Sequence, residues 1–419
     1  MYEYIYIIVL FLVIGVFAFV KIRYPFWSAQ PIFHSYDFWR HFSNTFFYIQ
    51  NGFPIKTKFC DSKRCLSIPY SEMNHKSIKK TIDLIQCYHI PSDRVIVTMD
   101  ISGLNSIMTG YSHPSYVTFY NESDFSIEYD PSSNSSHQIL EKPLPVGCIL
   151  SKPTRLFINT HGKMEEHVIY SWDYTCIHRD YIKKNISQNL IQTAEYNQRI
   201  KNPEILGTIF KKEGSFCDGV IPLVEFKTFL FYLRNVKLPP LPPKFTVTRI
   251  LHENLGLFSD FLYGITHPKR IIGNEEVQCP FFLLCIPEMG SINAMLKSEN
   301  MYAYVLQNAE HIYGLYIFKD AKINYEDVDN GNLLECVFSV SNTEMEGLFF
   351  SGFLNSLRGI LNLQKKYKMI LFNNLSHNPK ILEKWRWKYT PVFENKAAYY
   401  AYNMVIPGMP FQANKVAIL

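Results

Sequence analysis

The sequence lacks the short motifs that define the commonest hydrolases and nucleotide-binding enzymes. It has no GxSxG, no HExxH and no GxxxxGK[ST] pattern, which excludes the usual α/β-hydrolases, zinc metalloproteases and P-loop NTPases. Its nine cysteines include no CxxC pair, and its thirteen histidines show no metal-ligand spacing. We therefore expect reduced thiols in a cytosol-facing protein, with no disulfide framework, no metal site and no permanently bound cofactor.

Charge is also scarce. Only 19% of the 419 residues are charged, the formal net charge is +5 and no Arg-rich tract is present, so a nucleic-acid partner is not expected. The mild basic excess suits a phosphate-bearing ligand or an anionic membrane surface. With 47% hydrophobic and 16% aromatic residues, the chain is long and apolar enough for two or three domains.

One uncharged, almost wholly apolar run, Tyr4–Val20, stands at the N-terminus. Its length is at the short end of what spans a bilayer, and the basic residues Lys21 and Arg23 follow it while Glu3 precedes it. This asymmetry predicts a single-pass membrane anchor with the remainder of the chain facing the cytoplasm. A cleaved signal peptide and a buried core helix are the alternatives.

The rest of the chain alternates between strand and helix patterns. Period-2 and period-3.6 spacing predicts helices over 77–88, from 346 and over 381–387, and strands over 93–99, 147–156, 167–177, 301–306, 314–319, 333–339 and 369–373. Residues 120–138 are polar and predict a loop, and the proline-rich stretch 237–244 predicts an extended linker.

The C-terminus is unusual because it is apolar. Residues 398–403 read as a strand, and the chain then ends on Lys415-Val416-Ala417-Ile418-Leu419. Such an end is expected to be buried, which would take the α-carboxylate of Leu419 out of water. A desolvated carboxylate has a raised pKa and can serve as a base. The alternative is an ordinary last strand of a sheet.

Four segments together resemble the eukaryotic N-myristoyltransferases. Both ends of the chain and two internal segments match in order, although the sequence between them is poorly matched. The matching segments are Tyr24-Pro25-Phe26-Trp27-Ser28-Ala29-Gln30-Pro31, Asp173-Tyr174-Thr175-Cys176-Ile177-His178, Phe372-Asn373-Asn374-Leu375 with Leu382-Glu383-Lys384, and Tyr399-Tyr400-Ala401-Tyr402-Asn403 with the terminal Lys415–Leu419.

The resemblance implies an α+β fold built from two tandem GNAT-like acyltransferase halves with mixed sheets, preceded by the transmembrane helix. Boundaries follow at 1–23 for the anchor, 24–65 for a segment contacting acyl-CoA, 66–236 for the half that binds acyl-CoA, 237–244 for the linker and 245–419 for the half that binds peptide. It also implies that a long acyl group, myristoyl, moves from its coenzyme A thioester to an N-terminal glycine.

The roles of individual residues are likewise implied by the resemblance. The backbone amides of Tyr174 and Thr175 correspond to the oxyanion-binding pair, the Leu419 carboxylate to the base, and Asp173 to a polar residue of the glycine pocket. Three further residues are expected to contact the acceptor: Thr208, Tyr402 and Asn403. The residues expected to contact acyl-CoA are Tyr24, Phe26, Trp27, His178, Lys183, Lys184, Asn185 and Ser187.

The residues themselves support one part of this site. A strand that runs into the basic loop His178–Asn185 before a helix brings backbone amides and lysines together at a helix N-terminus, where anions bind. This suits the pyrophosphate of coenzyme A. A solvated basic turn is the alternative.

Several departures from the family pattern stand against activity. Asp173 replaces an asparagine, Ile182 and Asn185 replace arginines of the phosphate loop, and no acid-glycine cluster lies near Lys388–Pro391. The rival hypothesis is therefore a catalytically silent relative that keeps the fold and an acyl-CoA pocket and acts as a membrane scaffold.

Overall fold

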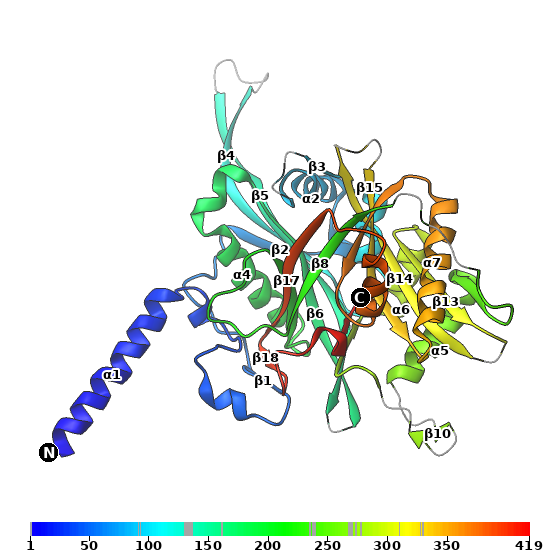
Figure 1. Cartoon of the computed structure of the whole chain (residues 1–419). Coiled ribbons are helices and arrows are strands. Elements are labelled where there is room, and N and C mark those ends of the chain that lie inside the picture. The colour runs from blue at the N-terminus through cyan, green and yellow to red at the C-terminus, as the bar shows by residue number, and fades with distance from the viewer. Residues whose placement is uncertain are drawn as a thin grey trace.

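The computed structural model describes residues 2–419 except 91, 93, 130–136, 161, 234–235, 237–239, 267–270, 273–274, 277–278, 310, 327 and 329–330. Its fold is α+β, as expected (Figure 1). One large mixed sheet of 15 strands runs through the molecule, and helices pack against it. Part of the expected linker, 237–239, lies outside the described residues.

The helices and strands have the following bounds. In the first half the strands are β1 (Phe47–Tyr48), β2 (Cys65–Pro69), β3 (Val95–Val97), β4 (Tyr116–Tyr129), β5 (His137–Thr160), β6 (Lys163–Ile177), β7 (Thr208–Glu213) and β8 (Val224–Tyr232). In the second half they are β9 (Thr246–Ile250), β10 (Ile271–Ile272), β11 (Glu275–Glu276), β12 (Leu283–Ile286), β13 (Met301–Gln307), β14 (Ile312–Tyr325), β15 (Gly331–Ser341), β16 (Tyr367–Asn373), β17 (Phe393–Tyr402), β18 (Met404–Val405) and β19 (Val416–Ile418). The α-helices are α1 (Tyr2–Arg23), α2 (His75–Tyr88), α3 (Ile101–Met108), α4 (Ile186–Lys201), α5 (Leu255–Thr266), α6 (Met289–Lys297), α7 (Glu346–Leu363) and α8 (Asn378–Arg386).

Local sequence signals explain several of these boundaries. The side chain of Asn74 accepts a hydrogen bond from the Ser77 amide and so caps the start of α2. Pro379 stands in the first turn of α8, where its missing N–H costs nothing. The predicted helices over 77–88 and from 346 are confirmed as α2 and α7, and the predicted strands are confirmed at β3, β5, β6, β13, β14, β15 and β16.

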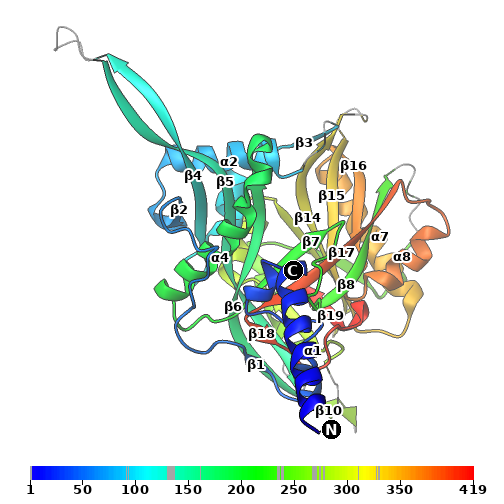
Figure 2. The same cartoon turned by 90° about the vertical axis from the view of Figure 1, so that its left-hand side faces the viewer.

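One prediction from the sequence is wrong. Residues 120–138 were expected to form a polar loop, but β4 continues to Tyr129 and pairs with β5 from Tyr116↔Ser151 to Tyr129↔His137. The two strands form a long hairpin that projects from the body of the protein (Figure 2). Polar residues are compatible with strand here because a projecting ribbon offers both faces to water, so no hydrophobic alternation is required.

The two halves share one sheet. Its order is β19-β12-β5-β6-β7-β17-β8-β16-β15-β14-β13-β9, so β17 from the end of the chain lies between β7 and β8 of the first half. It pairs antiparallel with both neighbours, for example Tyr402↔Thr208 and Phe393↔Leu230. The chain then ends after β19, which pairs with β12, and the C-terminus lies near the centre of the body in both views (Figures 1 and 2).

Helices α3 and α6 join the halves through a backbone contact. A Cβ atom added to Gly290 would lie 2.4 Å from the Gly110 carbonyl oxygen, and one added to Gly110, whose φ is +85°, would lie 2.4 Å from the Gly290 carbonyl carbon. Only glycine fits at both positions. The contact brings Tyr111 next to Ser291, whose hydroxyl donates to the Tyr111 oxygen at 2.9 Å.

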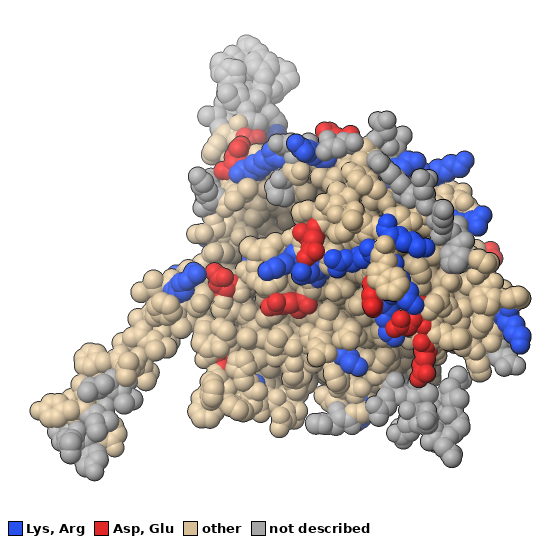
Figure 3. All heavy atoms as spheres, viewed as in Figure 1, with Lys and Arg blue, Asp and Glu red and all other residues tan. Residues whose placement is uncertain are grey.

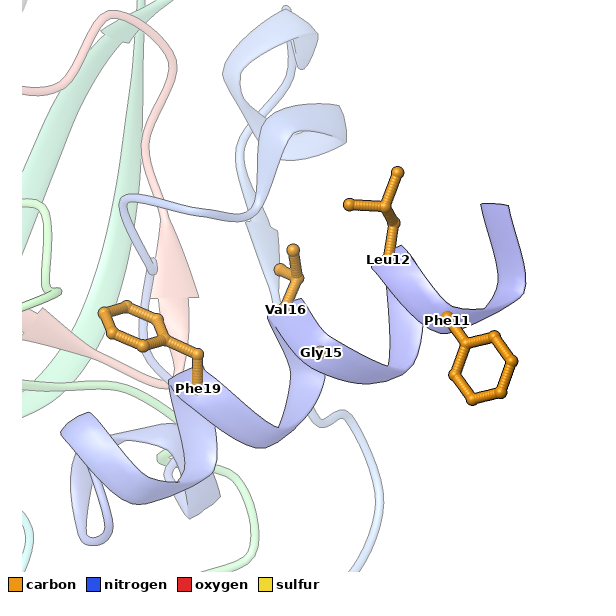
Figure 4. Close-up of a pocket in the computed structure, with 5 residues that line it drawn as sticks. All are labelled: Phe11, Leu12, Gly15, Val16 and Phe19. Carbon is orange, nitrogen blue, oxygen red and sulfur yellow. The ribbon is translucent and has the colours of Figure 1, made fainter. Parts of the chain in front are cut away.

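Helix α1 projects from the body (Figure 1). The side chains of Phe11, Leu12, Val16 and Phe19 surround Gly15 on its surface (Figure 4), and the apolar residues described in this helix are largely exposed. Even so, none of the helices within the described residues combines the length and the apolar character needed to cross a membrane. The structure therefore does not support the expected transmembrane helix.

Candidate active site at the splayed strands

The backbone of β6 is irregular at the segment expected to bind an oxyanion. Cys148 pairs with Cys176 and Leu150 with Asp173, so Tyr174 and Thr175 together oppose Ile149 alone. This is a β-bulge, which removes backbone groups from the ladder and redirects them. Tyr174 has a φ of 49°, a left-handed conformation that large side chains seldom adopt. Strain of this kind is concentrated at functional sites.

The bulge lies where two parallel strands separate. β6 and β7 pair only from Tyr170↔Thr208 to Trp172↔Phe210, although β6 continues to Ile177 and β7 to Glu213. Beyond Trp172 the edge of β6 that faces β7 has no β7 partner, so its backbone polar groups need another one. An extended ligand such as a thioester or a pantetheine amide supplies suitable partners. The splay and the bulge therefore coincide at residues 173–175.

An ion pair stands beside the bulge. Lys152 Nζ lies 2.6 Å from Asp173 Oδ2. Burial alone would raise the pKa of Asp173, but the charge of Lys152 outweighs burial and holds that pKa below its ordinary value of 3.8. Burial acts to lower the pKa of Lys152, but the charge of Asp173 raises it in turn. Asp173 is therefore a paired carboxylate at neutral pH, which makes it a weak proton acceptor.

A third charged group faces this pair from the second half. Burial, followed by the charge of Lys152, lowers the pKa of Lys319 in β14 to about 8. Lys319 pairs in register with Glu335 of β15, whose Oε1 accepts a hydrogen bond from Asn373 Nδ2 at 2.7 Å. Lysine and arginine side chains also run across the middle of the face shown in Figure 3.

The end of the chain reaches the same region. Leu419 is only 8% exposed, so the expected burial of the terminal residue is confirmed. Its amide donates to the Cys285 carbonyl oxygen at 2.9 Å, and its side chain packs in a core with Ile286. Lys152 and Asp173 both act electrostatically on the Cys285 thiol. Cys285 of β12 is therefore bonded to the last residue through its backbone and influenced by the ion pair through its thiol.

The N-terminal segment lies on the opposite face of the sheet, beside α4. The Trp27 ring stacks on Phe210 with centroids 5.9 Å apart, and Phe26 is buried against Trp27 and Phe59. The Tyr24 ring stacks on Tyr36 at 6.2 Å. Of the expected acyl-CoA contacts, Phe26 thus has a packing role in the described structure, while Tyr24 and Trp27 remain half-buried.

The expected phosphate loop has the predicted form. β6 ends at Ile177, a short 3₁₀ helix covers Arg179–Lys184 and α4 begins at Ile186, with Ser187 in its first turn. Asn185 takes a φ of 56° at the junction. The His178 ring packs against the Tyr88 ring in a tilted arrangement, with centroids 4.6 Å apart, and against the Tyr181 ring edge-on at 5.5 Å. The side chains of Lys183 and Lys184 lie outside the described part of the chain, so their role stays a prediction.

Two of the three expected acceptor contacts, Thr208 and Tyr402, lie on the opposite face of the sheet from Asp173. Thr208 is buried and accepts a hydrogen bond from Gln198 of α4 at 3.0 Å, and the Tyr402 hydroxyl donates to Gln30 at 2.6 Å. Asn403, with a φ of 60°, binds the Gln50 and Leu206 carbonyl oxygens through its side chain. Thr208 and Tyr402 share the α4 face with Trp172, and Asp173, the next residue in β6, points to the other face.

Sequence reasoning missed the lysines of the site. Lys152 and Lys319 stand in strands whose other residues are mostly buried or half-buried, and nothing in their sequence positions shows that their charges interact. The two residues lie on β5 and β14, which are not neighbours in the sheet, so the interaction depends on the tertiary fold. The replacement of an asparagine by Asp173 was the available signal, because a buried carboxylate requires a cationic partner.

The arrangement defines a class of fold before it matches a particular enzyme. It is a mixed sheet with a bulged strand, a splayed parallel neighbour and a late strand, β17, inserted between strands of the first half. Two structures of Saccharomyces cerevisiae N-myristoyltransferase with bound myristoyl-CoA superpose over 94% of this chain, with TM-scores of 0.62 and 0.63 and 12% identity. The superpositions include 98% and 94% of the two yeast enzyme chains. The resemblance expected from the four segments is thus confirmed for the fold.

No protein-family model matches the sequence, and comparison with curated protein sequences finds no match. At 12% identity the likeness defines the fold over nearly the whole chain, and the chemistry has to be argued from the residues of the site.

Proposed function

We propose that this protein is an acyl-CoA:protein N-acyltransferase that moves a long acyl chain, myristoyl, to an N-terminal glycine. The observation that carries the proposal is the coincidence of the Tyr174–Thr175 bulge with the splay of β6 and β7. A thioester carbonyl held there would meet backbone N–H groups at the position where the oxyanion of the tetrahedral intermediate develops. The myristoyl-CoA bound in the yeast structures supports this donor class.

The reaction requires one further group, a base for the attacking amine. An N-terminal ammonium must lose a proton before its nitrogen attacks the thioester carbon, after which the coenzyme A thiolate leaves and takes up a proton. The Leu419 α-carboxylate is our candidate base, because Leu419 is buried and its amide binds the carbonyl oxygen of Cys285, a residue whose thiol senses the charges of Lys152 and Asp173. Asp173 is less suited to this role since Lys152 lowers its pKa.

The C-terminal carboxylate is tested by moving it. Deleting Leu419 withdraws the carboxylate by one residue, and adding one glycine after it extends the chain. Each change is expected to lower the rate of glycyl-peptide acylation by about 10²–10⁴-fold, as is typical for loss of a positioned base. Binding of myristoyl-CoA, measured by calorimetry, should be largely kept.

Folding is the control for both variants, because Leu419 also packs in the core. Thermal melting of the same samples separates lost stability from lost chemistry. A well-folded extended variant that acylates peptide at the wild-type rate would rule out the Leu419 carboxylate. If the wild-type protein acylates no glycyl peptide but binds myristoyl-CoA, the silent scaffold is the correct alternative.

We also propose that α1 attaches the protein to a membrane, with residues from 24 onwards on the cytoplasmic side. The support is the exposed apolar surface of α1, including Phe11, Phe17 and Phe19, and the basic residues Lys21 and Arg23 at its end. Deleting residues 1–23 should release the protein from membranes in a flotation assay. Glycosylation at Asn121 in cells would place the chain on the other side and refute this topology.

A further inference from the structure

Two cysteines face each other across β5 and β6, next to the bulge. Cys148 pairs in register with Cys176, and both residues are fully buried. The His178 amide donates to the Val146 carbonyl oxygen at 2.8 Å, which makes 146/178 a hydrogen-bonded pair. In an antiparallel ladder every second pair has this geometry, so 148/176 has it too, with Cα atoms about 5.5 Å apart. Disulfides form over Cα separations of about 4.4–6.8 Å.

The two thiols and a histidine interact. The Cys148 thiol hydrogen-bonds to Cys176 and lowers the pKa of the Cys176 thiol, and a second hydrogen bond from His89 acts in the same direction against the effect of burial. The same hydrogen bond between the two thiols, together with burial, raises the pKa of Cys148. The His89 ring lies 4.7 Å from the Tyr174 ring, and Glu213 of β7 also interacts with His89. Cys176 is therefore the thiol of the pair that loses its proton more readily and becomes the nucleophile.

The residues around the pair are least buried on the side of the site. Thr175, the neighbour of Cys176 in the bulge, is exposed, and His89 is only half-buried. Because both cysteines are fully buried, a molecule as small as hydrogen peroxide reaches them by local opening at the bulge. The Cys176 thiol also donates to the Tyr174 carbonyl oxygen at 3.3 Å, so its state is linked directly to the strained residue of the bulge.

We propose that Cys148 and Cys176 are an oxidation site at which peroxide forms a disulfide across β5 and β6. The Cys176 thiolate attacks one peroxide oxygen and is oxidised to the sulfenic acid while the O–O bond breaks and, with one proton, water leaves. The Cys148 thiol then displaces the sulfenic oxygen as a second water and the S–S bond forms. Two thiols and one peroxide thus give one disulfide and two waters.

The disulfide has a consequence for the bulge. It replaces the contact of Cys176 with the Tyr174 carbonyl and fixes β6 to β5 one residue from Thr175. The backbone amides of Tyr174 and Thr175 then lose the position that we assign to oxyanion binding, so oxidation switches acyl transfer off. This second step rests on the proposed function, whereas formation of the disulfide does not.

The first test is chemical and uses the full-length wild-type protein. After treatment with hydrogen peroxide and blocking of free thiols, peptide mass spectrometry should find Cys148 and Cys176 joined with the loss of two hydrogens, and dithiothreitol should reverse this. Cys65 and Cys217 are buried controls within the same molecule, because burial raises their thiol pKa to about 12 and about 11. We expect the pair to oxidise at least about tenfold faster than either control.

The second test is functional. Peroxide should lower the acylation rate of the wild type at least about tenfold, with recovery in dithiothreitol, and Cys148→Ser should not show this reversible loss. The proposal would be overturned if peroxide oxidised only the exposed Cys87 and left Cys148 and Cys176 as free thiols that react with the blocking reagent. This outcome can be observed in the wild type even if no variant folds. A mapped disulfide in a protein that acylates no peptide before treatment would refute the proposed function and leave the oxidation site standing.

Discussion

Lys319 carries an unfavourable charge in the folded protein. Burial and the nearby charge of Lys152 lower its pKa from 10.5 to about 8. Between these two pH values the unfolded chain holds a proton that the folded protein has lost, so the free energy of unfolding rises with pH across this window. Below about pH 8 the penalty is fully present.

We expect Lys319→Met to stabilise the protein at pH 7 by on the order of 1–3 kcal/mol, because each pKa unit corresponds to about 1.4 kcal/mol. Urea unfolding at pH 7 and pH 10 measures the effect, and the rise of stability between them should shrink in the variant. Lys227→Met is the matched control, since Lys227 is exposed and paired with Glu394. A variant less stable than the wild type at pH 7 would show that Lys319 is held by favourable contacts.

For single residues, the sequence predicted where a functional residue lies better than it predicted which residue it pairs with. The family resemblance pointed to Tyr174 and Thr175, where the structure has its bulge, and to Leu419, which is buried. It did not predict that Asp173 would pair with Lys152, because the partner lies on another strand and the register between β5 and β6 shifts at the bulge. Such pairings depend on tertiary geometry that no local pattern records.

Among the secondary-structure elements, α4 has a particular anchoring role. Arg199, near its end, is almost completely buried and binds Glu195 at 3.0 Å. It also donates to the carbonyl oxygens of Gln50 and Gly52 at 2.9 and 2.6 Å, which fastens the N-terminal segment to the helix. Burial raises the pKa of Glu195 to about 6 in spite of the arginine.

Arg199→Met should destabilise the protein by about 3–5 kcal/mol at pH 8, since it leaves the Glu195 carboxylate buried without its partner. The folded pKa of Glu195 is raised, so its protonated form is favoured by folding and the loss should be smaller at pH 5. Denaturant unfolding at both pH values tests this. Arg249→Met, at the more exposed pair with Glu299, should cost less than about 1 kcal/mol. Equal losses at pH 5 and pH 8 would contradict the role of Glu195.

Helices and strands could be predicted from the sequence where one of their faces is buried. α2 and α7 have apolar stripes, and β13 to β16 are rich in buried β-formers, so both kinds were predicted correctly. The β4–β5 hairpin was not, because the polar residues 121–124 and 130–136 in the sequence outweigh the short alternation of Phe125, Ile127 and Tyr129. Its strand character comes from pairing with β5.

In the molecule as a whole, the two ends of the chain hold each other. Ile32 forms a bridge with Tyr402, the Asn403 amide donates to the Pro31 carbonyl oxygen at 2.6 Å, and the Tyr402 hydroxyl donates to Gln30 Oε1 at 2.6 Å. These residues belong to the two terminal segments that resemble the same family. The two segments resemble the family separately in the sequence, and in the structure they contact each other.

Tyr402→Phe should destabilise the protein by about 1–3 kcal/mol, because it leaves the buried Gln30 oxygen without its donor. A double-mutant cycle with Gln30→Leu should give a coupling energy of about 0.5–1.5 kcal/mol in urea unfolding. Tyr400→Phe serves as a control, because the Tyr400 hydroxyl accepts from the Cys217 amide and makes no contact of this kind with Gln30. Additive losses from Gln30 and Tyr402 would mean that the two ends are stabilised independently.

The position of β17 also governs how the protein is made. β7 and β8 leave the ribosome early, yet the strand that belongs between them begins only at Phe393. Synthesis of the chain from Glu213 to Phe393 takes roughly 10–40 s at ordinary elongation rates. During that time the nascent chain presents two unpaired strand edges, which are the surfaces that seed aggregation. A chaperone that shields these edges until translation ends would therefore govern how much active protein a cell obtains.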